Sequence, residues 1–290
     1  MPPTVPEPGQ QTATQSGEIT ARAIAQFADA IGDANPIFRD EAAAKAAGYR
    51  GVPAQPTFIT RFHISFGEAG LDPEHTQVLH GEQEYAYERP LVAGERVSVR
   101  YVVANVRQSR RADGMAIITL EQVIEVGDGE RPATGKAIVI VRDMAPGGAG
   151  ETTTGKQLPD PEGQRIPDLT KHVTQEQINA YAEVSGDHNP IHLNPEAARA
   201  VGLEGTIAHG MLSMAFLGQL LTDWLAQPGR AGWVRRLNVR FQAMVRPGDT
   251  LTCSGALGAA TGDEQHVELW INNQRGERVT TGSAEVVFAR

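Results

Sequence analysis

The pattern of apolar and polar residues along the chain predicts one fully buried helix and a series of half-buried strands. Residues Gly210 to Leu225 are apolar almost all round, which is typical of a helix enclosed by the rest of the protein. Other segments alternate between apolar and polar residues, as strands with one buried face do. We predict such strands at Val97–Val103, Ala116–Val126, Ala137–Val141, Leu237–Val245, Thr250–Ala256, His266–Asn272 and Ala284–Ala289. One long buried helix with a curved antiparallel sheet around it is an α+β arrangement.

Turn and cap residues predict shorter helices before the long one. Thr174 and Gln177 form a capping box for a helix that ends at Gly186. Residues Asp187–Pro190 predict a tight polar turn, since Asp, Asn and Pro each favour turns. A further short helix follows, with Pro195 in its first turn and an asparagine as its N-cap.

The chain repeats itself with a shift of 154 residues. The repeat holds one register over a long stretch and implies a duplicated fold. It aligns Asp33, Asn35, Pro36, Ile37 and Gly94-Glu95 with Asp187, Asn189, Pro190, Ile191 and Gly248-Asp249. The mismatches matter as much: Phe38 stands where His192 stands, and Gln55-Pro56 stands where His209-Gly210 stands. We therefore expect a single catalytic site, in the second half.

Composition divides the chain into two folded units. We predict a disordered tail over residues 1–16, a first unit over 17–143, a linker over 144–166 and a second unit over 167–290. The tail is rich in Pro, Thr and Gln, and the linker in Gly, Pro and Thr. In the first unit, residues 57–66 are the shorter counterpart of the long buried helix. Because the tail has no Lys, Arg or apolar run, we do not expect a signal peptide.

Charge and cysteine content narrow the function classes. The formal net charge of −9 argues against a general nucleic-acid binder, although a local basic patch could still bind phosphate. The one cysteine, Cys253, cannot form an internal disulfide, and we expect it to be a small core residue in a strand. No run approaches 18 apolar residues, so no membrane span is expected. The C-terminus lacks a peroxisomal Ser-Lys-Leu signal, so we expect a cytoplasmic protein.

Asp187 and His192 are the candidate catalytic residues. A carboxylate and an imidazole that flank one turn can grip a water molecule between them and move its proton. Asp187 and Asn189 could instead serve only the turn, because Asp33 and Asn35 recur where no histidine follows. His192 is the discriminating residue, since the repeat replaces it with phenylalanine.

These residues resemble a known family. Residues 186–192, Gly-Asp-His-Asn-Pro-Ile-His, followed by Ala-His-Gly-Met at 208–211, are similar to the hydratase-2 motif of MaoC-like hydratases and dehydratases. The second half matches this signature closely. The first half resembles the degenerate N-terminal domain of two-domain members. The resemblance implies a double hot-dog fold, in which each unit is a curved antiparallel sheet wrapped around a long central helix.

The resemblance also implies an activity. It is the reversible R-specific hydration of a trans-2-enoyl-CoA to a (3R)-3-hydroxyacyl-CoA, without a cofactor or a metal ion. Asp187 and His192 would be the catalytic pair, and Asn189 would orient the pair or the water. The backbone N–H of Gly210 would bind the thioester oxygen. It begins a helix, where N–H groups are unpaired and the helix dipole is positive, and glycine allows close approach. The implied partner is an acyl-CoA thioester.

The remaining histidines and arginines have structural or open interpretations. His209 either supports the start of the helix or takes part in the chemistry, and His188 should be exposed. His63, His75 and His80 are not spaced as metal ligands, so we expect them on the surface or in the core. Four arginines around a predicted strand could meet the phosphates of CoA or be solvated strand-edge charges: Arg235, Arg236, Arg240 and Arg246.

Several alternatives stay open. The closest is a (3R)-3-hydroxyacyl-acyl-carrier-protein dehydratase. A basic docking patch on the protein would favour this alternative. A thioesterase would need a carboxylate on or facing the central helix, where only Asp223 occurs, late in the segment. A non-enzymatic acyl-CoA-binding protein is the third. The first unit should complete the fold and shape the acyl pocket, and its short helix hints at space for a long or bulky acyl chain. Two fused units could form a pseudo-dimeric monomer or pair again into a homodimer.

Overall fold

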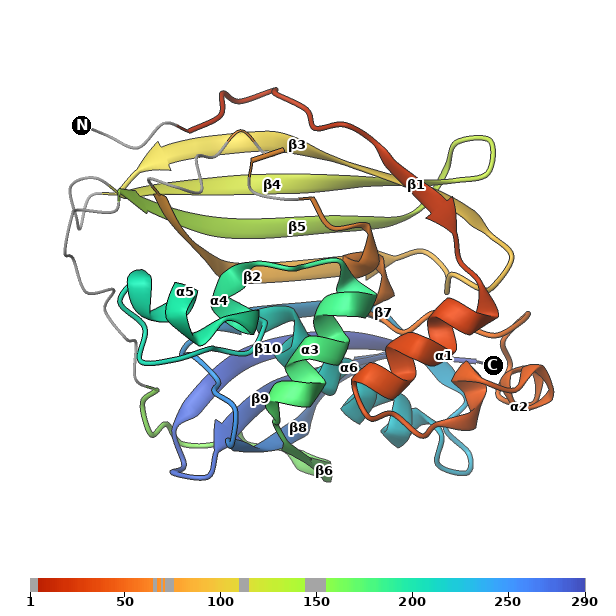
Figure 1. The fold of residues 1–290 in the computed structure, drawn as a ribbon. Helices are drawn as coiled ribbons and strands as arrows, with labels where there is room; N and C mark the ends of the chain where they lie inside the picture. Colours follow the sequence, from red (N-terminus) through yellow and green to blue (C-terminus); the bar gives the residue numbers. More distant parts are fainter. Residues whose placement is uncertain are drawn as a thin grey trace.

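A single antiparallel sheet of ten strands runs through the molecule (Figure 1). The computed structural model describes residues 5–64, 67–68, 70, 76–109, 115–143 and 155–289. In spatial order the strands are β1 (Gln15–Glu18), β3 (Arg96–Gln108), β4 (Met115–Val126), β5 (Glu130–Asp143), β2 (Thr76–Tyr87), β7 (Gly232–Phe241), β10 (Arg278–Phe288), β9 (Glu264–Asn273), β8 (Thr250–Thr261) and β6 (Gln164–His172). The five strands on each side of the β2–β7 pairing belong to one sequence repeat, so the repeats form the two halves of one sheet.

The helices lie together on one side of this sheet (Figure 1). In the first unit they are α1 (Ala21–Ala30), η1 (Pro36–Phe38), α2 (Glu41–Ala46) and η2 (Phe58–Phe62). In the second they are α3 (Gln175–Ser185), α4 (Pro190–Leu193), α5 (Pro195–Ala200) and α6 (Gly210–Leu225). Among the helices that are described, none is both long and apolar enough to cross a membrane.

Helix α6 is the buried helix that the sequence predicts, with the same bounds. Every residue in it is buried except Gly210 and Asp223, because it packs against β6, β7, β8 and β9 while other helices cover it. A helix enclosed on all sides needs apolar residues all round, which explains its composition. The strands predicted around it are present, and Cys253 is fully buried in β8 as expected.

The predicted caps are also confirmed. The Thr174 hydroxyl accepts a hydrogen bond from the backbone N–H of Gln177 at 3.2 Å and caps α3. Gly186 ends that helix with φ of 78°, a left-handed conformation that suits glycine. At the start of α5, the side chain of Asn194 accepts hydrogen bonds from two backbone N–H groups of the first turn.

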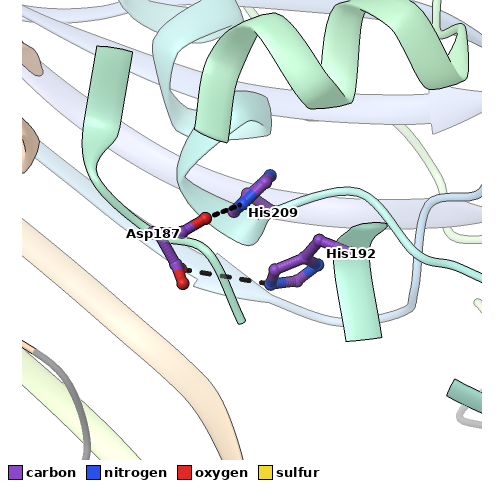
Figure 2. A group of neighbouring side chains, drawn as sticks. All are labelled: Asp187, His192 and His209. Carbon is purple, nitrogen blue, oxygen red and sulfur yellow. Dashed lines mark hydrogen bonds and ion pairs between the residues drawn. The ribbon is translucent and has the colours of Figure 1, made fainter. Parts of the chain in front are cut away.

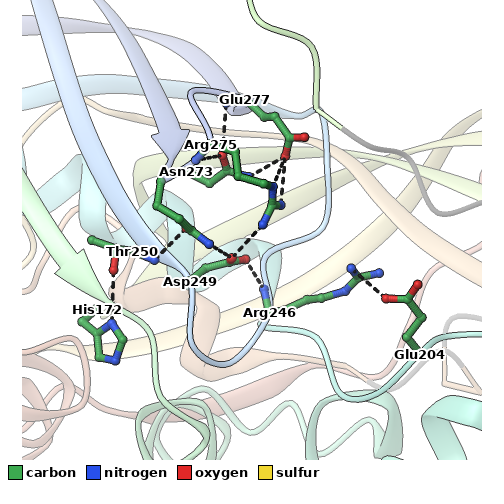
Figure 3. A network of polar contacts seen from close by, with 9 residues as sticks. His172, Glu204, Arg246, Asp249, Thr250, Asn273, Arg275 and Glu277 are labelled. Carbon is green, nitrogen blue, oxygen red and sulfur yellow. Dashed lines mark hydrogen bonds and ion pairs between the residues drawn. The ribbon is translucent and has the colours of Figure 1, made fainter.

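Aligned residues of the two sequence repeats make equivalent hydrogen bonds. In the first unit, Asp33 Oδ1 accepts from the N–H of Asn35 at 2.8 Å, and in the second Asp187 Oδ1 accepts from the N–H of Asn189 at 3.2 Å. Further along, Asp249 Oδ2 accepts from the N–H three residues earlier, at 2.8 Å (Figure 3). Its counterpart Glu95 makes the same contact at 2.8 Å. The shared acidic residues therefore build turns in both units.

Three expectations need correction. The tail predicted as disordered runs along the edge of β3 from residue 5 onward, with β1 paired to β3. The predicted linker includes the start of β6 at Gln164, and its residues 144–154 lie outside the described part. Of the predicted helix at 57–66, the structure describes residues 57–64, which contain the short 3₁₀ helix η2, and residues 65 and 66 lie outside the described part. Strands β1 and β6, which lie in these segments, pair through backbone hydrogen bonds, and polar sequences can make such bonds without an apolar face.

Candidate active site

The predicted catalytic residues come together in one place, at the end of α3 and the start of α6 (Figure 2). Asp187 follows α3, His192 lies in the one-turn helix α4, and His209 is the N-cap residue of α6. The Nε2 atom of His192 is 4.0 Å from Oδ2 of Asp187. The Pro-containing turn between them brings both side chains to the same cavity, as the sequence suggested.

Backbone carbonyl groups fix the orientation of both imidazoles. His192 Nδ1 is 2.8 Å from the carbonyl oxygen of Ile207, so Nδ1 carries the hydrogen and donates it. The lone pair of Nε2 in the neutral ring then faces Asp187. His209 Nε2 donates to the carbonyl oxygen of Asp187 at 2.9 Å, and its ring lies 3.8 Å from that of His192. His209 thus holds the Asp187 backbone and supports the start of the helix, one of the two roles expected for it.

Burial and neighbouring charges set the protonation states. Burial lowers the pKa of His192 and lowers that of His209 to about 4, the latter helped by the neighbouring His192. Burial alone would raise the pKa of Asp187, but His63, then His192 and His209, outweigh it and leave this pKa below its usual value. Near neutral pH the site therefore holds a carboxylate and two neutral imidazoles.

Asn189 and Gly210 line the same cavity. The side-chain oxygen of Asn189 caps α4 by accepting from the N–H of Ile191 at 3.3 Å. Gly210 begins α6, where backbone N–H groups have no partner within the helix. A Cβ atom at this position would come within 3.2 Å of the Phe241 ring, so any other residue would push that ring slightly out of place.

His63 is a site residue that sequence reasoning missed. It follows η2 in the first unit, yet its Nε2 lies 3.9 Å from Oδ1 of Asp187. No motif surrounds it, so only the packing of one unit on the other reveals it. His80 also lines the cavity, with its Nε2 buried. His188 is exposed, as expected, and His75 lies outside the described residues.

The cavity has a volume of about 310 Å³, at the lower end of the range for small-molecule sites. Its walls come from both units, with strands β2 to β5 opposite the loops that carry Asp187 and His192. The equivalent place in the first unit is lined by Phe38, Gln55 and Pro56 and holds only about 30 Å³. The aromatic ring that replaces the histidine helps to close that space.

Asp187, His192 and His209 are close enough to hold a metal ion, since their ligand atoms lie within 4.8 Å of one another. His192 Nδ1 and His209 Nε2 both donate to backbone carbonyl oxygens, so His192 Nε2 and His209 Nδ1 are the ring nitrogens left to act as ligand atoms.

The four arginines considered for phosphate binding all have acidic partners. Arg246 lies 3.0 Å from Glu204 (Figure 3), and Arg240 lies 3.5 Å from Glu82. Arg236 is near two glutamates and Arg235 contacts Glu264. Ion pairs with glutamates of β2, β9 and β10 account for Arg235, Arg236 and Arg240 on the central strand β7, while Arg246 directly follows cavity-lining residues.

Comparisons with known proteins identify the class. Residues 158–282 match the model of the MaoC like domain, and residues 7–134 match the FAS1-like dehydratase domain region. The chain belongs to the MaoC-like dehydratase family, with a MaoC like domain in its second half and a FAS1-like dehydratase domain region in its first, and it has the double hot-dog fold. In the first unit, the described residues at the place of the central helix form the short helix η2.

Individual known proteins are similar to this chain in sequence or in fold. A UPF0336 protein of Thermobifida fusca is 40% identical over 136 residues, which are 45% of this chain and 88% of that protein. The 3-hydroxyacyl-thioester dehydratase X of Mycobacterium tuberculosis is 30% identical over 168 residues, 56% of this chain and 53% of that protein. A solved MaoC-like dehydratase shares the fold with a TM-score of 0.82 at 22% identity, covering 97% of this chain and 98% of that one.

Proposed function

We propose that this protein is a hydro-lyase that catalyses the reversible R-specific hydration of trans-2-enoyl-CoA to (3R)-3-hydroxyacyl-CoA. The observation that carries the proposal is the 4.0 Å gap between His192 Nε2 and Asp187 Oδ2 in a cavity. Two hydrogen bonds of about 2.8 Å that meet at one water oxygen at a near-tetrahedral angle span roughly 4.0–4.6 Å. The pair is therefore spaced to hold one water molecule.

The proposed reaction transfers one proton and forms one C–O bond. His192 Nε2 accepts a proton from the bound water while the water oxygen attacks Cβ of the enoyl group. The imidazolium that forms keeps its Nδ1–H bond to the Ile207 carbonyl and faces the Asp187 carboxylate, which stabilises it. The accepted proton then passes to Cα, so water is added across the double bond. Such positioned proton transfer contributes roughly 10²–10⁴-fold to the rate.

Gly210 would stabilise the other charge that develops. Attack at Cβ moves electrons onto the thioester oxygen, which needs a hydrogen-bond donor as it becomes an enolate. The unpaired N–H at the start of α6 supplies one, together with the positive end of the helix dipole. Asp223, the carboxylate of α6, does not line the cavity, so it does not fit the base that a thioesterase would need on the central helix.

The acyl chain would lie against the first unit. Because η2 replaces a long helix there, the inner faces of β2 to β5 contribute to the cavity wall. This supports the expectation that the site accepts long or bulky acyl groups, and hydration restricted to four-carbon chains would count against it.

The activity is tested by following loss of the enoyl-thioester absorbance with crotonyl-, octenoyl- and hexadecenoyl-CoA. Asp187→Asn keeps the oxygen that accepts from Asn189 but removes the charge, and His192→Ala removes the base. Each should lower kcat/KM by about 10³-fold, with (3R)-hydroxyacyl-CoA as the wild-type product.

The matched control is His188→Ala, an exposed histidine in the same turn, which should retain full activity. If the folded wild-type protein were inactive on every acyl-CoA but active on acyl-carrier-protein thioesters, its substrate would be carried by acyl carrier protein instead of CoA. Inactivity on both would support a binding protein instead.

A further inference from the structure

The wall that the first unit contributes to the cavity is partly polar, although a hot-dog interior normally packs apolar side chains against a helix. One row of inward-facing positions crosses the sheet from Tyr101 on β3 to Gln122 on β4, Gly135 on β5 and Tyr85 on β2. Gln83, on the adjacent row of β2, extends it. We call Gln83, Tyr85, Tyr101 and Gln122 the polar floor; all four are buried.

A chain of hydrogen bonds orders the polar floor and gives it a direction. The Gln83 amide donates to Oε1 of Gln122 at 3.0 Å, and the Gln122 amide donates to the hydroxyl oxygen of Tyr101 at 2.8 Å. Tyr101 therefore accepts at its oxygen and keeps its own hydrogen to donate. Because Tyr101 lines the cavity, the chain ends in a donor that a ligand can reach.

Gly135 is shaped to this arrangement. A Cβ atom there would stand 2.0 Å from Oε1 of Gln122, so any other residue would displace the amide that links the chain. The absence of a side chain at Gly135 thus makes room in the row for the polar side chain of Gln122.

Two further buried groups face the same cavity without a partner among the described residues. The hydroxyl of Tyr181, on α3, is fully buried and has no partner at normal hydrogen-bond geometry, although the nearby Thr60 side chain lowers its pKa. Nε2 of His80, on β2, likewise has no such partner, and its nearby polar side chain is Gln83. A buried polar atom without a partner costs about 1–3 kcal/mol, so such atoms are rare unless a ligand or water satisfies them.

We propose that the polar floor, with Tyr181 and His80, binds a hydroxyl or keto oxygen carried by the acyl group beyond C3. The preferred substrates are then oxygenated acyl thioesters rather than plain alkyl ones. This rests on the proposed function in placing an acyl thioester in the cavity. The oxygen is neutral rather than a carboxylate, because the floor consists of Tyr and Gln side chains without a cation. Arg142, also a lining residue, is seven positions from Gly135 along β5, roughly 23 Å in an extended strand.

The test is equilibrium binding of saturated acyl-CoAs, which cannot react, so that it stays separate from the test of catalysis. Octanoyl- to dodecanoyl-CoA are compared with the same chains carrying one hydroxyl or keto group, moved from C4 outward. We expect one position of the oxygen to tighten binding at least ~10-fold over the plain chain, since a site built for a hydrogen bond discriminates against an analogue that lacks it.

Tyr101→Phe and Tyr181→Phe keep the ring and remove the hydroxyl, so each should bring the affinity for the oxygenated chain down toward that for the plain chain. Tyr49→Phe is the matched control: Tyr49 also belongs to the first unit, but its hydroxyl donates to the Gly232 carbonyl at 3.0 Å, away from this cavity. Equal binding of plain and oxygenated chains at every position would show that water satisfies these groups and would overturn the proposal. Failure of all these chains to bind, plain and oxygenated alike, would also overturn the proposal.

Discussion

Asp187 and Asp33 are chemically the same residue in the same turn, and their surroundings give them different properties. Each accepts a hydrogen bond from the N–H two positions later, so both are needed for the turn. Asp187 faces three imidazoles and a cavity, which hold its pKa down. Asp33 is buried, and burial raises its pKa to about 6. The difference that matters for catalysis is therefore the partner, His192 or Phe38.

The pH dependence of kcat/KM should show that His192 works as a base. A base must be unprotonated, so activity falls on the acidic side as Nε2 gains a proton. Because burial lowers the pKa of His192 despite the opposing Asp187, the acidic midpoint should lie below the ordinary value of 6.5. The groups that face this imidazole are Asp187, His63 and His209. A midpoint clearly above 6.5 would contradict the assignment.

His63 should matter for the rate through Asp187. After burial, its imidazole has the largest effect on the pKa of Asp187, which it lowers. We expect His63→Gln to lower kcat by roughly 10-fold, about 1.4 kcal/mol, and to move the acidic midpoint to higher pH. KM should change less, since the substrate contacts are kept. His172→Gln, a distant exposed histidine, is the control; equal loss in both variants would mean a general effect on folding.

At the scale of elements, a buried polar cluster ties the turn after α1, in which Asp33 lies, to α6 and β6. Lys171 of β6 donates to the carbonyl groups of Ile31 and Gly32, and Gln219 of α6 also donates to Gly32. One oxygen of Asp33 has no partner among the described residues. This cluster joins the two units at the expense of burying a carboxyl group.

Asp33→Asn should therefore change how stability depends on pH. The pKa of Asp33 is raised from 3.8 to about 6 in the folded state, so the folded protein holds this proton more tightly than the unfolded one. The wild type then loses stability as pH rises through this window, and the variant does not. Relative to wild type, the variant should gain about 2–3 kcal/mol in the free energy of unfolding between pH 4 and pH 7.

Denaturant unfolding of both proteins at several pH values measures this difference, and the effects of other titrating groups cancel in it. The exposed Asp29→Asn variant, in α1, serves as the reference. A difference between variant and wild type that stays constant with pH would show that Asp33 is ionised equally in both states.

Which elements the sequence predicts depends on where their side chains point. Helix α6 and strand β4 bury apolar side chains, so their periodicity is clear and their positions follow from it. Strand β2 was missed because its inner face carries Gln83 and Tyr85 and lines a cavity instead of an apolar core. Strand β6 was missed because six of its nine residues are exposed.

The candidate active site divides in the same way. Asp187, His192 and Gly210 lie in one motif of the second unit, where short-range spacing brings them together. His63 and the polar floor reach the cavity only through pairing of the two units. Such contacts leave no periodic or local signal in the sequence.

At the scale of the molecule, the β2–β7 pairing makes the two units one structure. Glu82 to Ala86 of β2 pair with Arg236 to Arg240 of β7, so hydrogen bonds run through the sheet from one unit into the other. The aromatic rings of Phe27 and Tyr181, from α1 and α3, also contact across the units, 5.8 Å apart. Because the cavity is walled by both units, losing either one would open it.

We therefore expect the two units to unfold together, and the tryptophans offer a direct test because all three lie in the second unit. Ile118→Ala removes a fully buried side chain from β4 of the first unit and should cost about 2–5 kcal/mol. If the units are coupled, the tryptophan fluorescence transition in denaturant moves to lower concentration by the same amount as the circular dichroism transition. The exposed Glu121→Ala change in the same strand should move neither. A fluorescence transition that stays in place while part of the dichroism signal is lost earlier would show that the units unfold independently.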